Sequence, residues 1–218
     1  MTASKTLPAA DVPDAGGRVS FVARQPILTA DEKVFGYELL FRDGVENYFR
    51  ETDSDSASRR TLDTSLQIGL EVLCDGRRGF VNCTRDVLLK DYMTLLPSTL
   101  AVAEVLESVP ADDLVIAGLQ RLKQAGYLIA LDDFTLNDPR TPLTEMADII
   151  KVDVRATKME DCIAIAKKQG PWRCRLLAEK VEAREGSPPR RPPGLSTFRD
   201  ISFAVRKFCT QRKSRPTD

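Results

Sequence analysis

The sequence predicts one α/β domain built as a (β/α) barrel, and three observations lead to that class. Short β-like runs alternate with amphipathic helical patterns along most of the chain. The connections between them are short, as in βαβ units with parallel strands. Six or seven such units suit a closed barrel better than an open sheet, and 218 residues can bury one large core.

Seven short segments have the composition and pattern of strands. They are rich in β-branched and aromatic residues or form short apolar runs, and turn residues bound them. We expect each to pair with its neighbour in chain order, so that the sheet is parallel. In order, the predicted strands cover residues 20–23, 34–41, 79–83, 100–105, 128–131, 149–152 and 175–178.

Three stretches between these strands have apolar residues at three- and four-residue spacing, which is the pattern of a helix with one buried face. They are 57–73, with Leu62, Leu66, Leu70 and Leu73 on that face; 112–124, with Val115, Leu119 and Leu122; and 159–168, with Cys162, Ile163, Ile165 and Ala166.

The composition excludes several classes of function. The chain has no histidine, which removes Ser-His and Cys-His catalysis and histidine metal ligands. Its five cysteines are widely spaced and include no CxxC, so we expect buried free thiols. No run of about 18 uncharged apolar residues could span a membrane, and nothing near the N-terminus resembles a secretory signal. We therefore expect a cytoplasmic protein.

The composition changes near the C-terminus. The decapeptide GSPPRRPPGL at 186–195 holds four prolines, and residues 184–218 hold nine basic against three acidic residues. We divide the chain into a flexible arm at 1–19, the barrel at 20–185 and a basic, irregular tail at 186–218. No segment of the tail has the pattern of the eighth strand, so we expect an incomplete barrel whose gap is left open or loosely covered by residues 196–208. Residues 196–212 have the pattern of a short basic amphipathic helix.

Polar residues interrupt the predicted strands near their C-terminal ends. In a parallel barrel those ends meet at one rim, where such barrels carry their chemistry. Taken singly, an acid in this place is more often a helix cap or a solvated loop residue. The set comprises Glu38, Asn82, Glu104, Asp132, Asp133, Lys151, Asp153, Glu179 and Glu182.

Two members of this set are more specific. Asp132 and Asp133 directly follow the apolar run YLIAL, where two acids are costly unless a cation pairs with them. Lys151 lies among Ile149, Ile150 and Val152, where its buried ammonium needs a carboxylate partner. Several carboxylates at one rim cannot all stay ionised without cations, and oxygen ligands without histidine favour Mg²⁺ or Mn²⁺ over zinc.

Seven motifs between Arg24 and Glu182 resemble, in order, those of the EAL family of bacterial cyclic di-GMP phosphodiesterases. They are QPI, YELLFR, FVNCT, EVLES, ALDDF, DIIKVD and AEKVE. The stretch VARQPILTADEKVFGYELLFR is further similar to the subgroup that joins an EAL domain to an HD-related output domain. The resemblance implies a TIM-like barrel and hydrolysis of cyclic di-GMP to linear pGpG.

The resemblance also implies a role for each matching residue. Two Mg²⁺ or Mn²⁺ ions would be bound by Glu38, Asn82, Glu104, Asp132 and Asp133. Lys151 and Glu179 would hold and deprotonate the attacking water, with Glu38 counted among the catalytic residues. The dinucleotide side of the site would be formed by Gln25, Arg42, Asp153 and Glu182, with Glu182 also bracing a nearby loop. A homodimer or a signalling protein is the expected partner.

The chain departs from the family pattern in two places. The family loop DFGTGYSS reads here DFTLNDPRTPL, and Thr135 and Asn137 lack the freedom at positive φ that glycine has. After Glu185 nothing matches the family's last strand, and we hypothesise a shift of reading frame near 184–186. A catalytically silent module that binds cyclic di-GMP or a protein is therefore the alternative to an enzyme. A nucleic-acid binder ranks far behind, since the basic tail lacks aromatic platforms.

Overall fold

The computed structural model describes residues 12–13, 19–29, 31, 33–42, 54–169, 174–181 and 201–205. Strands and helices alternate along these ranges, as the sequence predicts. The strands are β1 (Val12–Pro13), β2 (Val19–Leu28), β3 (Val34–Arg42), β4 (Arg78–Cys83), β5 (Ala101–Val105), β6 (Leu128–Leu131), β7 (Ile149–Asp153), β8 (Arg175–Val181) and β9 (Ile201–Val205). The helices are α1 (Ser54–Ile68), α2 (Leu70–Leu73), α3 (Arg85–Leu89), α4 (Asp113–Gln124) and α5 (Met159–Gln169), with 3₁₀ turns η1 (Tyr92–Leu95) and η2 (Thr141–Glu145).

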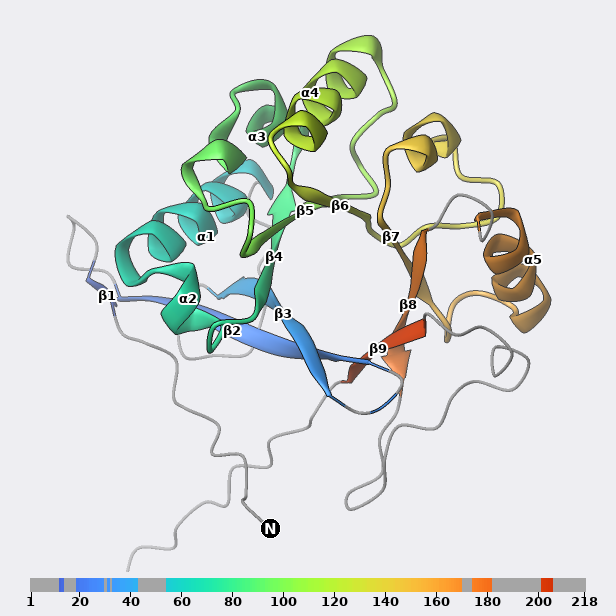
Figure 1. Ribbon diagram of the computed structural model, residues 1–218, viewed down its shortest axis with the longest axis horizontal. Helices are drawn as coiled ribbons and strands as arrows, with labels where there is room; N and C mark the ends of the chain where they lie inside the picture. The colour runs from blue at the N-terminus through green and yellow to red at the C-terminus, as the bar shows by residue number, and fades with distance from the viewer. Residues whose placement is uncertain are drawn as a thin grey trace, which may run out of the picture.

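The strands form a ring with the helices on its outside, so the predicted barrel fold is confirmed (Figure 1). Strands β3 to β9 pair in chain order and in parallel. The expectation of a fully parallel sheet is wrong for β2, whose pairings with β1, β9 and β3 are all antiparallel. A short connection at residues 29–33 reverses the chain there, where a parallel crossover would need a dozen residues or more.

The tail contributes a strand, which corrects the expectation that it would supply none. Strand β9 pairs with β8 in parallel and with β2 antiparallel, so it joins the two edges of the sheet. The predicted helix within 196–212 is also wrong over these five residues. The closure between β9 and β2 is short, because the two strands pair at Ile27↔Ala204 and Leu28↔Phe203. At the other end, β1 pairs with β2 inside the segment expected to be a flexible arm.

Side chains alternate between the two sides of the ring. One residue from each of six strands packs into a cluster inside the barrel, and Phe35 lies edge-on against its Phe80. The residues between them face outward into the larger core beneath the helices, as Val81, Ala103 and Ile150 do. The inner cluster consists of Ile27, Phe80, Val102, Ala130, Ile149 and Leu177, all at most 3% exposed.

Local sequence explains where the helices begin and end. Asp112 caps α4 by accepting a hydrogen bond from the Val115 amide at 2.9 Å, and Arg121 and Lys123 lie in its last turn. The single helix predicted over 57–73 is divided at Gly69, whose φ of 88° ends α1 before α2 begins.

Two further predictions concern the chain as a whole. Among the described residues, no helix is long and apolar enough to cross a membrane. Cys74, Cys83 and Cys162 are free and buried, as expected, and Cys174 is free and half-buried. Cys209 lies outside the described residues. Burial raises the pKa of the Cys74 thiol to about 12, so this group stays protonated and unreactive.

Candidate active site

The candidate site lies directly above the inner cluster, at the C-terminal ends of the strands. Because side chains alternate along a strand, the residue two positions after an inner apolar residue also faces the barrel interior. In five consecutive strands that residue is polar. The pairs are Phe80 and Asn82, Val102 and Glu104, Ala130 and Asp132, Ile149 and Lys151, and Leu177 and Glu179.

The ammonium group of Lys151 lies at the centre of four carboxylates. Its side chain is 1% exposed, and the prediction that it pairs with Asp132 or Glu179 is confirmed for both. These carboxylates come from β3, β5, β8 and the residue after β6, so four separate strands converge on one cation. Lys151 Nζ lies 2.7 Å from Asp132 Oδ1, 2.8 Å from Glu179 Oε1 and 3.8 Å from Glu38 Oε2, and also contacts Glu104 Oε1.

Burial and mutual repulsion shift the protonation of these groups. Burial raises the pKa of the Glu104 carboxyl well above its ordinary value; Lys151 opposes this, and Glu38 and Asp132 add to it. Burial likewise raises the pKa of Glu179 to about 7, against the opposing charge of Lys151. Burial alone would lower the pKa of Lys151, but the surrounding carboxylates raise it well above its usual range. One ammonium does not balance this much negative charge.

Two buried oxygens at the rim have no donor within the part of the chain that the structure describes. Among the described residues, Oδ1 of Asn82 and Oε2 of Glu104 are buried and accept no hydrogen bond. The two residues are partners in the β4–β5 register, so both oxygens lie at the same level of the barrel. A buried acceptor without a donor is costly unless something cationic approaches it. This arrangement fits a divalent cation.

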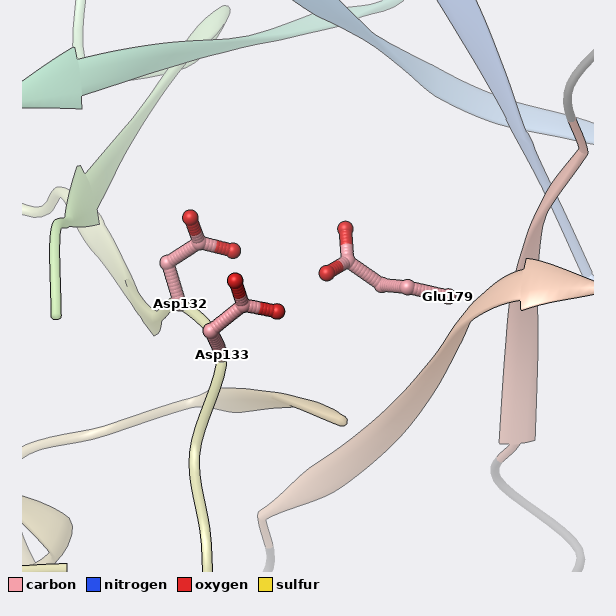
Figure 2. A group of neighbouring side chains, drawn as sticks. All are labelled: Asp132, Asp133 and Glu179. Atoms are coloured by element: carbon pink, nitrogen blue, oxygen red, sulfur yellow. The ribbon is translucent and has the colours of Figure 1, made fainter. Parts of the chain in front are cut away.

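A second group of oxygens lies beside the first. Asp132, Asp133 and Glu179 each offer one carboxylate oxygen, and these three oxygens lie within 4.8 Å of one another. Figure 2 shows the two aspartate side chains, which follow β6, and Glu179 on β8 pointing toward one another. An all-oxygen donor set is the kind that Mg²⁺, Mn²⁺ and Ca²⁺ prefer. The predicted ligands thus fit a metal, and Lys151 links the two groups by contacting both Glu104 and Asp132.

The predicted substrate-binding residues are only partly placed. Gln25 on β2 is the register partner of Glu38 on β3, which puts it at the same rim. Asp153 ends β7 opposite Glu179, and its Oδ1 accepts hydrogen bonds from the amides of Arg155 and Ala156, so it also shapes the following turn. Arg42 ends β3, but its side chain and all of Glu182 lie outside the described residues.

One buried charged pair near the site was not predicted. Arg140 and Asp138 lie in the loop after β6 and are 2% and 6% exposed. The guanidinium binds both carboxylate oxygens of Asp138, at 2.9 and 2.7 Å. It also donates to the main-chain carbonyl of Asp132 at 2.7 Å. Nothing in the local sequence distinguishes this arginine from the exposed arginines of the chain.

Two curated relatives are similar to most of the chain. The cyclic di-GMP phosphodiesterase CdgJ of Vibrio cholerae is 36% identical over 203 residues, which is 90% of this chain. The uncharacterized protein YuxH of Bacillus subtilis is 34% identical over 190 residues, which is 84% of this chain. The chain spans 46% of the length of each relative. No family model matches the chain.

Solved structures share the fold at lower sequence identity. An EAL domain protein from Listeria monocytogenes matches with a TM-score of 0.61 at 18% identity, covering 85% of each chain. The YkuI protein of Bacillus subtilis, which has an EAL domain and was solved with its substrate c-di-GMP and calcium, matches with a TM-score of 0.56 at 21% identity. This match covers 75% of the present chain and 49% of YkuI. At these identities the structures establish the barrel fold.

Proposed function

This chain contains an EAL domain, and from that premise we propose that it hydrolyses cyclic di-GMP to linear pGpG. The observation that carries the proposal is the convergence of Glu38, Glu104, Asp132 and Glu179 on Lys151. A silent module would not need to keep five buried or half-buried charges together, since an unbalanced buried charge destabilises a fold. The catalytically degenerate alternative is therefore not favoured.

The site would hold divalent cations, and we propose two ions of Mg²⁺ or Mn²⁺. Glu38, Asn82, Glu104 and Asp132 would hold one ion, and Asp133 would bind a second beside Asp132. A relative of this fold was solved with calcium, which supports a divalent metal without choosing the ion. When bound, such ions offset the charge of a phosphodiester and make water a better nucleophile near neutral pH.

The protein groups would position and deprotonate the attacking water. Glu179 would accept the proton of the water that attacks phosphorus, and Lys151, 2.8 Å from Glu179 Oε1, would hold that carboxylate and the water in place. The bond between phosphorus and the water oxygen forms as one P–O ester bond breaks, and the departing sugar oxygen takes up a proton. Gln25, Arg42, Asp153 and Glu182 would contact the dinucleotide.

The experiment is a hydrolysis assay on the whole chain with cyclic di-GMP and either Mg²⁺ or Mn²⁺. Glu104→Gln keeps the volume of a fully buried side chain and removes its charge, so turnover should fall by at least about 100-fold. Glu107→Gln changes an exposed acid three residues later, in the loop after β5, and should keep full activity. Cyclic di-GMP binding without any turnover, with either metal, would instead support the silent module.

Location and partners belong to the same proposal. Free, buried cysteines and a nucleotide substrate fit a reducing cytoplasm. The homodimer, the signalling partner, the HD-related output domain and the shift of reading frame stay predictions.

A further inference from the structure

Arg140 connects the ends of the two neighbouring strands that carry Glu104 and Asp132. Its guanidinium donates at 3.4 Å to the carbonyl of Val105, the last residue of β5. It donates at 2.7 Å to the carbonyl of Asp132, the residue after β6. Each of these carbonyls belongs to a predicted metal ligand or its immediate neighbour in the chain.

The second of these hydrogen bonds orients a constrained peptide. The Asp132 carbonyl belongs to the peptide bond that joins Asp132 to Asp133, and Asp133 has a φ of 42°. A side chain other than glycine rarely adopts that conformation unless its surroundings impose it. Holding the Asp132 carbonyl fixes the plane of this peptide and so the direction in which both aspartate side chains leave the backbone.

The guanidinium is itself held rigidly. Asp138 binds it through two parallel hydrogen bonds, a geometry that an arginine forms and a lysine does not. Asp138 Oδ1 also accepts the Arg140 amide at 2.7 Å, and the Arg140 guanidinium carbon lies 5.9 Å from the centre of the Phe134 ring. The pair is buried, so solvent screens these contacts little.

We propose that Arg140, held by Asp138, is a positioning residue that sets the metal-binding geometry of Asp132 and Asp133. It would do this in the loop DFTLNDPRTPL, which lacks the glycines of the family pattern. The buried ion pair would thus fix the conformation of this loop without the glycines. This inference rests on the proposed function only in assigning a divalent metal to Glu104 and Asp132.

The test measures Mn²⁺ binding to the whole chain by titration calorimetry, together with thermal unfolding in EDTA. In Arg140→Lys the paired hydrogen bonds are lost, and Mn²⁺ affinity should fall by about 10- to 100-fold, as on loss of a group that orients a ligand. Because Arg140→Lys leaves buried charges poorly paired, a second variant combines Arg140→Met with Asp138→Asn. It removes both charges and the donors to the two carbonyls but keeps an acceptor for the Arg140 amide.

Two controls separate the possible failures. Arg121→Lys alters an exposed arginine that contacts Asp91 at 2.9 Å and should leave Mn²⁺ affinity unchanged. Glu104→Gln should abolish binding; if it does not, the proposed metal site is wrong, whatever Arg140 does. If Glu104→Gln abolishes binding but the folded double variant binds Mn²⁺ within threefold of the parent, Arg140 is not a positioning residue. Failure of the double variant to fold would also count against the proposal, since the pair would then serve the fold itself.

Discussion

The ammonium of Lys151 lies 2.8 Å from Oε1 of Glu179, although the two residues are offset by two positions in the β7–β8 register. Lys151 is the register partner of Leu177, and Glu179 follows two residues later, so the two side chains meet from successive levels of the barrel. The contact unites the two groups proposed to hold and deprotonate water. We therefore expect Lys151 to stabilise the metal-free protein.

Replacing Lys151 by methionine should therefore affect both activity and stability. Hydrolysis should fall below detection, and unfolding in urea with EDTA should show a loss of about 3–5 kcal/mol, because four carboxylates lose their cation. Lys123→Met is the matched control, since Lys123 contacts Asp148 at 2.7 Å but its side chain is 36% exposed. That variant should lose about 1 kcal/mol at most and keep its activity. Equal losses in the two variants would contradict the central role of Lys151.

Replacing Asn82 by alanine should separate metal binding from stability. The buried Oδ1 accepts no hydrogen bond from the described residues, so the metal-free variant should keep its stability to within about 1 kcal/mol. At 100 times the dissociation constant, Mn²⁺ should raise the melting temperature of the parent by about 5–10 °C. Asn82→Ala should lose most of that rise, measured by thermal unfolding at the same Mn²⁺ concentration. Asn137→Ala, in the exposed loop, should keep it.

The raised pKa of Glu179 predicts a pH dependence of stability. Burial raises this pKa from 4.5 to about 7 in the folded protein. The folded state then holds the proton more tightly than the unfolded chain, so the stability that Glu179 contributes is complete below about pH 4.5 and is lost as pH rises through about 7. The free energy of unfolding of Glu179→Gln minus that of the parent should rise across this window, by a few kcal/mol at most. A difference that stays flat in EDTA-treated samples would contradict it.

Interrupting β9 should destabilise the whole barrel. Phe203 pairs with Ala178 of β8 and Leu28 of β2, so both sides of its backbone face a neighbouring strand. In Phe203→Pro the amide donor is lost and the ring opposes pairing, which should cost more than about 1 kcal/mol and promote association through the freed edges. Phe203→Leu keeps the amide and is the control. Both effects can be read from urea unfolding and from light scattering.

The strands in the middle of the barrel were predicted well because each is a short apolar run bounded by turn residues. Strand β6 matches the expected range, and β4, β5 and β7 differ from it by one residue at one end. Strand β2 was predicted far too short, since Pro26 argues against a central strand. Pro26, which has no amide donor, is tolerated because β9 pairs with β2 at Ile27 and Leu28 and not at residue 26.

Other features depend on contacts that no local pattern contains. Residues Ile201, Phe203 and Val205 alternate as in a strand, but the same segment also has apolar residues at helical spacing. Pairing with β8 and β2 stabilises the strand, and no local pattern contains those contacts. The acidic residues of the site were predictable because polar side chains interrupt apolar runs. Arg140 was not, since apart from Asp138 its partners are main-chain carbonyls 8 and 35 residues away.

The two-residue step from the inner apolar cluster to the site also limits how the chain can change length. Inserting one residue between Val102 and Glu104 would turn the carboxylate out toward the helices, and inserting two would displace it by about 7 Å along the barrel. The same holds for Ala130 and Asp132 and for Leu177 and Glu179. Insertions and deletions in homologous barrels should therefore be absent from these strand interiors and collect in the loops that follow them, such as 135–142.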